Sequence, residues 1–376
     1  MLGLARSGQA AVAALGRRGV EVVAADRTLG NDGDLSLLDG VLLMVKSPGV
    51  PPEAPLVAEA RHRGVPVWSE VELGYRLVRP RLVGVTGTNG KTTTTELLGA
   101  MLNAPTAGNV GRALTGLDGQ VDPGTLVVCE LSSFQLEDVH ELACEVAVLL
   151  NLEPDHLDRY AGFDEYRAAK LRIFERARAK VVPKGSGLAG IEFSADDDLP
   201  AEPLIRGAHN RENAAAATAA AHALGVPDVR IAQALRTFPG VPHRLEPVGE
   251  VNGVRYVNDS KATNVAAALR ALAAYEDEPL HLILGGSRKG EDFTPLARAL
   301  GANVKSVHLI GETAGELAVA IPQAHDDGDL TAAVGHVEAE PGDVVLLSPA
   351  CASYDQYANF EERGEEFRRL VQNLTG

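Results

Sequence analysis

Short apolar runs alternate with Ala- and Leu-rich helical patterns along almost the whole chain. Strands that alternate with helices favour parallel sheets covered by helices, so this pattern predicts an α/β fold. The predicted strands are Val20–Ala25, Leu42–Val45, Leu82–Val85, Leu126–Cys129, Val146–Leu150, Val254–Val257, Leu280–Leu284, Ser306–Ile310 and Val344–Leu347. The predicted helices are Gln9–Arg18, Thr92–Leu102, Phe163–Ala179, Arg211–Leu224, Val229–Thr237, Val265–Ala274, Thr294–Leu300 and Phe360–Leu374.

The chain has 376 residues, which is more than one hydrophobic core usually serves. Arg79-Pro80 precedes the most glycine-rich strand-to-helix turn, and Pro239–Pro242 places two prolines in four residues after a helical stretch. Such segments are typical of boundaries and linkers. We therefore expect three domains, residues 1–79, 80–240 and 241–376, and a surface loop at Pro183–Pro203.

The formal net charge is −16, which disfavours nucleic-acid binding because the sequence has no segregated basic patch. The sequence also has no apolar run of eighteen residues and no signal-peptide pattern at its start, so we expect a cytoplasmic protein without membrane insertion. The cysteines are Cys129, Cys144 and Cys351. Their spacing fits no metal site, and we expect small buried thiols.

The strongest local signal is Gly84–Thr92, a glycine-rich segment between a predicted strand and a predicted helix. Glycines let a backbone wrap a phosphate, Lys91 can neutralise phosphate charge, and Thr92 can offer its hydroxyl to Mg²⁺. The segment departs from the common P-loop pattern, because Val85 stands where the first glycine is expected. It predicts a nucleoside triphosphate site and leaves the reaction open, the alternative being a glycine turn with a chance lysine.

Carboxylates follow two further predicted strands. Glu130 ends one strand, and Asn151–Asp158 follows the next with three acids and His156. The carboxyl ends of parallel strands line the crevice where such sheets bind ligands, so Glu130 is a natural Mg²⁺ ligand. Taken alone, His156 also fits a surface position, and Lys170 on a predicted helix also fits a solvated cation.

Gly3–Gly8 forms a glycine turn, and Asp26 ends the next predicted strand. In isolation this pattern is compatible with a dinucleotide site or with a turn kept for helix packing.

Several motifs together resemble the Mur ligase family. They are Thr86–Thr92, Asp155-His156 with Lys170 fourteen residues on, His209–Asn213 at the start of a helix, and His243-Arg244 after the second linker. Three further regions resemble the D-glutamate-adding members of that family. They are Glu130–Glu137, Asn258–Asn264, and Ser348–Ser353 leading to Phe360–Gly364.

The resemblance covers nearly the whole chain and implies three α/β domains. These are a Rossmann-like N-terminal domain for a UDP-linked substrate, a central P-loop ATPase-type domain and a Rossmann-like C-terminal domain for D-glutamate. It implies an ATP-dependent, ADP-forming amide ligase of peptidoglycan precursor synthesis, which adds D-glutamate to UDP-N-acetylmuramoyl-L-alanine through an acyl phosphate. We expect a monomer.

The resemblance also implies roles for individual residues. For catalysis they are Lys91, Glu130, His156, Lys170 and Asn109. Around ATP they are Gly87, Thr88, Asn89, Gly90, Lys91, Thr92, Asn213, Arg244, Asp259 and Lys261. Near the other substrates they are Ser7, Ser47, Ser132, Gln135, Thr263, Lys289, Ser353, Tyr354 and Phe360. Two Mg²⁺ sites would be formed by Thr92, Glu130, His156 and a Lys170 that CO₂ has carbamylated.

One departure from the family pattern is that the strand expected before the first glycine turn is missing, because that turn begins at Gly3. Three alternatives to a D-glutamate-adding ligase stay open. A folylpolyglutamate synthase shares the ATP motifs but lacks a UDP-binding first domain, which argues against it. A nucleotide-binding switch does not account for His156, Lys170 and Asp259–Asn264 together. The third alternative is an inactive scaffold, which the missing first strand suggests.

Overall fold

The computed structural model describes residues 1–156, 159–288 and 290–374. Contacts divide the chain into two compact units. The first unit comprises Met1–Leu204 and His209–Phe238, and the second comprises Ile205–Ala208 and the residues from Pro239 onward. The second unit resumes at Pro239, where the predicted linker begins. The division into three domains at 79/80 and 240/241 remains a prediction.

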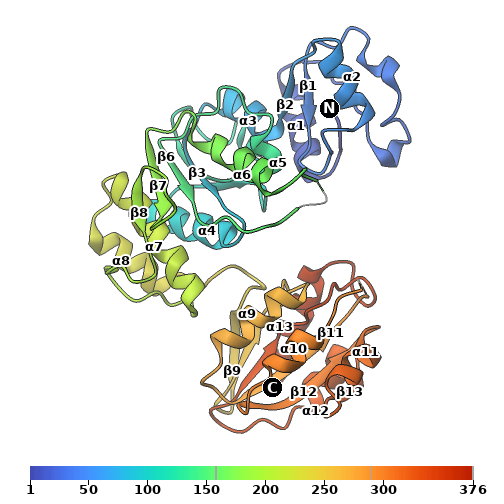
Figure 1. The fold of residues 1–376 in the computed structure, drawn as a ribbon, viewed down its shortest axis with the longest axis vertical. Coiled ribbons are helices and arrows are strands. Elements are labelled where there is room, and N and C mark those ends of the chain that lie inside the picture. The colour runs from blue at the N-terminus through green and yellow to red at the C-terminus, as the bar shows by residue number, and fades with distance from the viewer. Residues whose placement is uncertain (157–158, 289, 375–376) are drawn as a thin grey trace. The chain divides into compact units, whose positions relative to one another are not determined.

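A parallel six-stranded sheet forms the centre of the first unit (Figure 1). In sheet order its strands are β4 (Thr106–Gly108), β5 (Leu126–Glu130), β3 (Arg81–Thr86), β6 (Val146–Leu149), β7 (Ala179–Pro183) and β8 (Ile191–Phe193). The helices that accompany it are α4 (Lys91–Leu102), α5 (Ser133–Leu136), α6 (Phe163–Leu171), α7 (Ala208–Ala223) and α8 (Asp228–Thr237).

Helices cover both faces of this sheet because successive residues of a buried strand point to opposite sides. On β3, Val83 and Val85 pack with α4, α7 and α8. The intervening Leu82 packs instead with α3 (Glu70–Val78), with residues of α5 and with the 3₁₀ turn η3 (Leu114–Leu117). All three cysteines are buried and free, as the sequence predicted, and the predicted α/β class is confirmed.

Two predictions for the segments around β7 and β8 are wrong. The predicted helix Phe163–Ala179 ends at Leu171 and is followed by the 3₁₀ turn η4 (Arg172–Phe174). It stops because the chain joins the sheet, where Arg178 and Ala179 donate backbone hydrogen bonds to residues 144 and 145. The predicted loop Pro183–Pro203 contains β8, which pairs with β7 and forms the sheet edge.

The first 79 residues contain α1 (Arg6–Arg17), α2 (Pro55–His62), α3 and the parallel pair β1 (Met44–Lys46) and β2 (Val67–Ser69). Leu2 makes parallel bridges to Ala25 on one side and to Lys46 on the other. A short segment at Leu2 therefore lies where the missing first strand was expected. Val20–Ala25, predicted as a strand, makes one bridge at Ala25, because Met1–Gly3 offers it partners only near that end.

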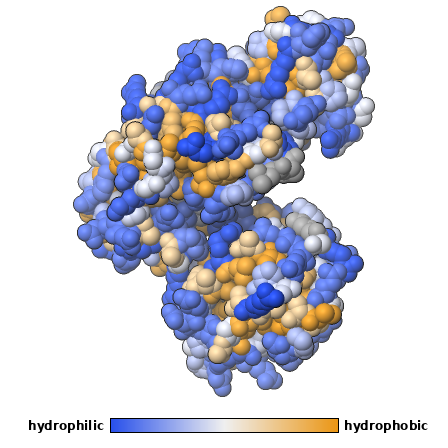
Figure 2. Space-filling view, in the orientation of Figure 1, coloured by the Kyte–Doolittle hydropathy of each residue, from blue (hydrophilic) through white to orange (hydrophobic). Residues whose placement is uncertain are grey.

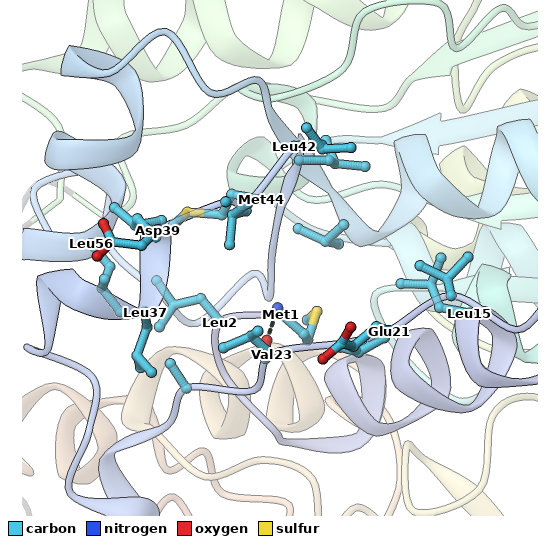
Figure 3. Close-up of a pocket in the computed structure, with 18 residues that line it drawn as sticks. Met1, Leu2, Leu15, Glu21, Val23, Leu37, Asp39, Leu42, Met44 and Leu56 are labelled. Atoms are coloured by element: carbon cyan, nitrogen blue, oxygen red, sulfur yellow. Dashed lines mark hydrogen bonds between the residues drawn. The ribbon is translucent and has the colours of Figure 1, made fainter.

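Beside Leu2 lies a mainly apolar cavity of about 490 Å³ (Figure 3). Leu15, Leu37 and Met44 line it, and the Met1 ammonium group donates to the Val23 carbonyl at 2.7 Å. Burial of this terminal ammonium group lowers its pKa. The side chain of Leu42 at the cavity wall is 89% exposed, so the apolar packing of this region is open on one side.

The second unit is also a helix-covered sheet. Its strands, in order, are β13 (His325–Gly328), β12 (Val304–Ile310), β11 (Leu280–Gly285), β14 (Val344–Leu347), β10 (Val254–Asn258) and β9 (Glu246–Val251). All pairings are parallel except β9 with β10. Helices α9 (Val265–Ala274), α10 (Thr294–Ala299) and α11 (Ala314–Ala320) cover one face, and α12 (Leu330–His336) and α13 (Phe360–Asn373) cover the other.

The visible surface is mostly hydrophilic, with scattered hydrophobic areas (Figure 2). Across the described ranges, we find no helix with the length and apolar character needed to span a bilayer.

Residues 1–79 are joined to the central sheet by buried ionic contacts. Glu72 of α3 is fully buried, and its carboxylate accepts the backbone N–H groups of residues 140–142 at 2.9 to 3.2 Å. Burial alone would raise the pKa of Glu72, but these hydrogen bonds and that from Arg76 hold the pKa below its usual value. Nearby, the buried Lys46 Nζ lies 2.8 Å from Asp138 Oδ2.

We expect Glu72→Gln to lower the free energy of unfolding by about 2 kcal/mol, because an amide offers one acceptor where the carboxylate serves four donors. The measurement is urea unfolding of both proteins. Because the folded pKa is depressed, the stabilisation is present above the ordinary pKa of about 4.3 and is lost as pH falls through the folded value. Glu141→Gln, at a mostly exposed neighbour, should change stability little. Equal effects of the two substitutions would contradict this assignment.

Candidate active site

The predicted phosphate loop lies between β3 and α4 (Figure 1). Gly90 has φ +81°, and a Cβ built there would lie 2.1 Å from Asn213 Oδ1. Glycine is favoured by the left-handed backbone conformation, and a side chain here would have to displace that of Asn213 on α7. Asn213, predicted near ATP, accordingly lies against the loop. The Lys91 Nζ donates to the carbonyls of Gly87 and Thr88 at 2.9 and 2.7 Å.

Glu130 ends β5, the strand beside β3, and pairs in register with Val85 just before the loop. Asn109 Nδ2 donates to Glu130 Oε1 at 3.2 Å, so the structure brings these two predicted residues together. Glu130 Oε2 is buried, and in the described part of the chain no hydrogen-bond donor reaches it. A buried carboxylate oxygen without a donor is a fitting ligand for a cation.

Lys170 on α6 is buried rather than solvated, with 2% of its surface exposed. Its Nζ donates to the Gly87 carbonyl at 2.8 Å, which is the same oxygen that Lys91 contacts. Burial, and then the charge of Lys91, lower the pKa of Lys170 to about 7. A substantial fraction of this amine is therefore neutral near pH 7.

Tyr166 connects three of the predicted residues, although the sequence reasoning did not select it. Its hydroxyl lies 3.0 Å from Thr88 Oγ1, and its ring lies 4.7 Å from Lys170 Nζ and 6.3 Å from the His156 ring centroid. The available signal was its position four residues before Lys170, on the same helix face. Asn151 was also missed, and its Oδ1 accepts the backbone N–H of Asn89 at 2.8 Å.

His156 is exposed on the loop after β6 and has a positive φ of 53°. Its Nε2 lies 3.6 Å from Asp155, and its ring lies 4.8 Å from that of Phe134. Among the residues described, no three His, Cys, Asp or Glu side chains are grouped to hold a metal ion. Oxygen donors from Glu130 and Thr92 nevertheless suit Mg²⁺, so the residues present fit one such ion beside the loop.

The four first-unit residues that were predicted near the other substrates form two pairs. Ser7 Oγ lies 3.4 Å from Ser47 Oγ, which also donates to the Gly3 carbonyl at 2.8 Å. Ser132 and Gln135 form a capping box at the start of α5, and Gln135 Nε2 is a buried donor without a hydrogen-bond partner in the described structure. Gln135 thus retains one donor beyond its structural role.

The predicted residues of the second unit lie on loops after β10 and β14 and at the start of α13. Asp259 is buried and accepts from Ser348 Oγ at 2.8 Å, and burial raises the pKa of Asp259 to about 7. Lys261 Nζ lies 5.5 Å from the centre of the Phe360 ring. Of the remaining predicted residues, Arg244 follows the linker and Thr263 is partly exposed. Ser353 is buried, whereas Tyr354 is 73% exposed. Lys289 lies outside the described residues.

Two family models match the chain. The Mur ligase middle domain matches residues 85–184, and the Mur ligase glutamate ligase domain matches residues 243–351. The matched ranges contain Lys91, Glu130, Lys170 and the loop after β10.

Solved structures of this family share the fold. UDP-N-acetylmuramate-alanine ligase MurC from Thermotoga maritima has a TM-score of 0.66 at 19% identity, covering 99% of this chain and 98% of its own. The MurF ligase from the same organism, in complex with ADP, has a TM-score of 0.59 at 17% identity over 89% and 96%. Its folylpolyglutamate synthase has a TM-score of 0.57 at 14% identity and covers 74% of this chain and 88% of its own.

Relatives with closer sequences carry one shared name. Proteins from Desulfitobacterium hafniense (strain Y51) and Sphingopyxis alaskensis are 40% and 41% identical, and both matches cover at least 99% of this chain and 96% of the relative. Each is named UDP-N-acetylmuramoylalanine–D-glutamate ligase. At such identity over nearly full length, the chain belongs to the Mur ligase family of ATP-dependent ligases, within the branch of these D-glutamate ligases.

Proposed function

We propose that this protein joins D-glutamate to UDP-N-acetylmuramoyl-L-alanine, coupled to cleavage of ATP to ADP and phosphate, in peptidoglycan precursor synthesis. The observation that carries this proposal is the match of about 40% identity along almost the whole length of ligases with that name. The arrangement of Lys91, Glu130 and Asn109 at the phosphate loop supports it, because these groups suit the handling of a triphosphate and a second anion.

In the proposed reaction the alanine carboxylate of the UDP substrate attacks the γ-phosphorus of ATP. An O–P bond forms, the bond from phosphorus to the β–γ bridging oxygen breaks, and ADP leaves. The D-glutamate amine then attacks the acyl-phosphate carbonyl, phosphate departs, and the amine loses a proton as the amide forms. Two anions must meet in the first step, so charge neutralisation and alignment are what the protein has to supply.

Side chains and backbone groups of the chain would supply this charge neutralisation and alignment. Lys91 turns from the loop carbonyls to the phosphates, and backbone N–H groups at the start of α4 hold them. Asn109, beside Glu130, orients the reacting carboxylate. Mg²⁺, when bound, would offset the charge on the phosphate oxygens. Thr92 and Glu130 would hold one ion, and His156 with a modified Lys170 would hold a second.

Lys170 is proposed to be carbamylated. Its neutral amine adds to CO₂, a C–N bond forms, and one proton leaves, so that a cation becomes a carboxylate-like anion. Burial and the nearby Lys91 favour the neutral amine needed for this step. The product would also remove the repulsion between two lysines that share the Gly87 carbonyl.

We further propose a cytoplasmic monomer with no nucleic-acid partner and no membrane insertion, in keeping with the net charge of −16. Residues 1–79 would bind the UDP group, residues 80–240 ATP, and residues 241–376 D-glutamate. Asp259, Arg244 and Lys261 would contribute to the nucleotide site, and Thr263, Lys289, Ser353, Tyr354 and Phe360 to the amino acid site.

The reaction is tested by measuring ADP release with ATP, Mg²⁺ and UDP-N-acetylmuramoyl-L-alanine. We expect release that requires the UDP substrate and D-glutamate, and little release with L-glutamate, L-alanine or L-lysine. The product should be identified by mass spectrometry. Folded protein that binds ATP yet releases no ADP with any of these amino acids would rule the proposal out.

Lys91→Ala should abolish product formation while the protein keeps its unfolding temperature, because the loop loses its phosphate-neutralising cation. Lys184→Ala, at an exposed lysine after β7, is the matched control and should retain normal activity. An active Lys91→Ala protein would refute the ATP-loop assignment.

Lys170→Ala should lose most activity and regain part of it with formate or acetate, because a small carboxylate can replace the carbamate in the space left by the side chain. Carbon-13 NMR of wild-type protein under ¹³CO₂ should show a carbamate signal that is absent from the variant. Full activity without added acid, together with no carbamate signal, would exclude the modification.

A further inference from the structure

Arg363 on α13 has no role in the proposed chemistry, yet it is the largest fully buried side chain of the described residues. Its exposed fraction is 1%. No carboxylate of the described chain lies within ion-pair distance of its guanidinium group, although the partly buried Arg368 and the exposed Arg369 on the same helix pair with glutamates. A buried cation costs free energy unless hydrogen bonds satisfy it, so its donors must be used in some other way.

Neutral oxygens satisfy the guanidinium group. Nε donates to Ser260 Oγ at 2.9 Å, and Nη2 donates to the Ser260 carbonyl at 2.9 Å and to the Cys351 carbonyl at 3.0 Å. Nη1 donates to the Ala352 carbonyl at 3.1 Å and, more weakly, to the Gly285 carbonyl at 3.4 Å. One planar group thus holds three backbone segments that lie far apart in sequence.

These segments lie at or just after the ends of β10, β11 and β14, which are neighbours in the sheet, so they meet at one end of the sheet. The segment after β10 carries Thr263, and the segment after β14 carries Ser353. Ser260 extends the contact to Phe360, since its Oγ donates to the Phe360 carbonyl at 2.8 Å. Among the described residues, Arg363 therefore touches, directly or through one hydroxyl, the segments that carry Thr263, Ser353 and Phe360, which are proposed to line the amino acid site.

Gly286 makes room for the guanidinium group. A Cβ at this position would lie 2.9 Å from Arg363 Nη1 and 2.1 Å from the Ala352 carbonyl, and its φ is +141°. A side chain at residue 286 would force the loops apart, so the glycine and the arginine form one packing unit.

We propose that Arg363 is the positioning residue of the amino acid site, whose guanidinium fork sets the spacing of the three loops that hold D-glutamate. The inference rests on the proposed function for the identity of the ligand. Lysine cannot replace arginine here, because an ammonium group lacks the planar fork needed to reach three segments at once.

The test compares Arg363→Lys with Arg369→Lys, the same change at an exposed position of the same helix. In Arg363→Lys, kcat/KM for D-glutamate should fall roughly 10- to 100-fold, since small misplacements of binding groups have effects of that size. The KM for UDP-N-acetylmuramoyl-L-alanine should stay within about twofold, because the residues proposed to bind it lie in the other unit. Arg369→Lys should match wild type. Unchanged D-glutamate kinetics in Arg363→Lys would overturn the proposal.

Ser260→Ala provides a milder second variant, because it removes only the Nε acceptor and the link to Phe360. We expect a several-fold rise in the KM for D-glutamate, and no rise would also count against the proposal. Hydrogen exchange gives a readout that needs no substrate. In Arg363→Lys the amides of Asp259, Gly285 and Ser287 should lose protection together, and unchanged protection would overturn the loop-spacing role. If these amides respond but wild type shows no D-glutamate-dependent ADP release, the proposed function fails and the loop-spacing role stands.

Discussion

The parallel pairing of β3 with β5 and β6 is the constraint on which the candidate ATP site depends. Parallel strands end at the same edge of a sheet, so segments that are separated by tens of residues meet there. The register that sets Val85 opposite Glu130 brings the carboxylate next to the phosphate loop. The end of β6 brings Asn151 to the same loop, and α6 then returns Lys170 to the Gly87 carbonyl. Sheet register thereby determines the chemistry at this edge.

The candidate ATP site also needs a local positive charge, because the chain as a whole has a net charge of −16 and its proposed substrates are anionic. Lys91 and Lys170 both donate to one carbonyl oxygen, although their positions differ by 79 residues. Burial, and then repulsion by Lys91, lower the pKa of Lys170 to about 7. Lys91 is therefore the group that provides local attraction for phosphate against an unfavourable overall field.

The second unit has the same parallel-strand geometry, but the loops at the carboxyl ends of its strands are held in a different way. Here the loops after β10, β11 and β14 are held by a buried guanidinium group rather than by a glycine-rich turn before a helix. One guanidinium group can hold several segments because its planar set of donors can bond to carbonyl oxygens on each of them. Both units therefore hold their loops through hydrogen bonds to backbone groups.

The sequence by itself determined the α/β class, most core strands, the phosphate loop and the family, since these depend on local periodicity and on residue types at short spacing. It did not determine where the chain would leave a helix for the sheet, as at Leu171, or that Pro183–Pro203 would supply an edge strand. Nor did it show that Lys170 is buried against the loop, that Tyr166 lies between Thr88 and Lys170, or that Arg363 joins three loops. These features were decided by the tertiary structure, because strand pairing and burial join residues that the local pattern treats as independent.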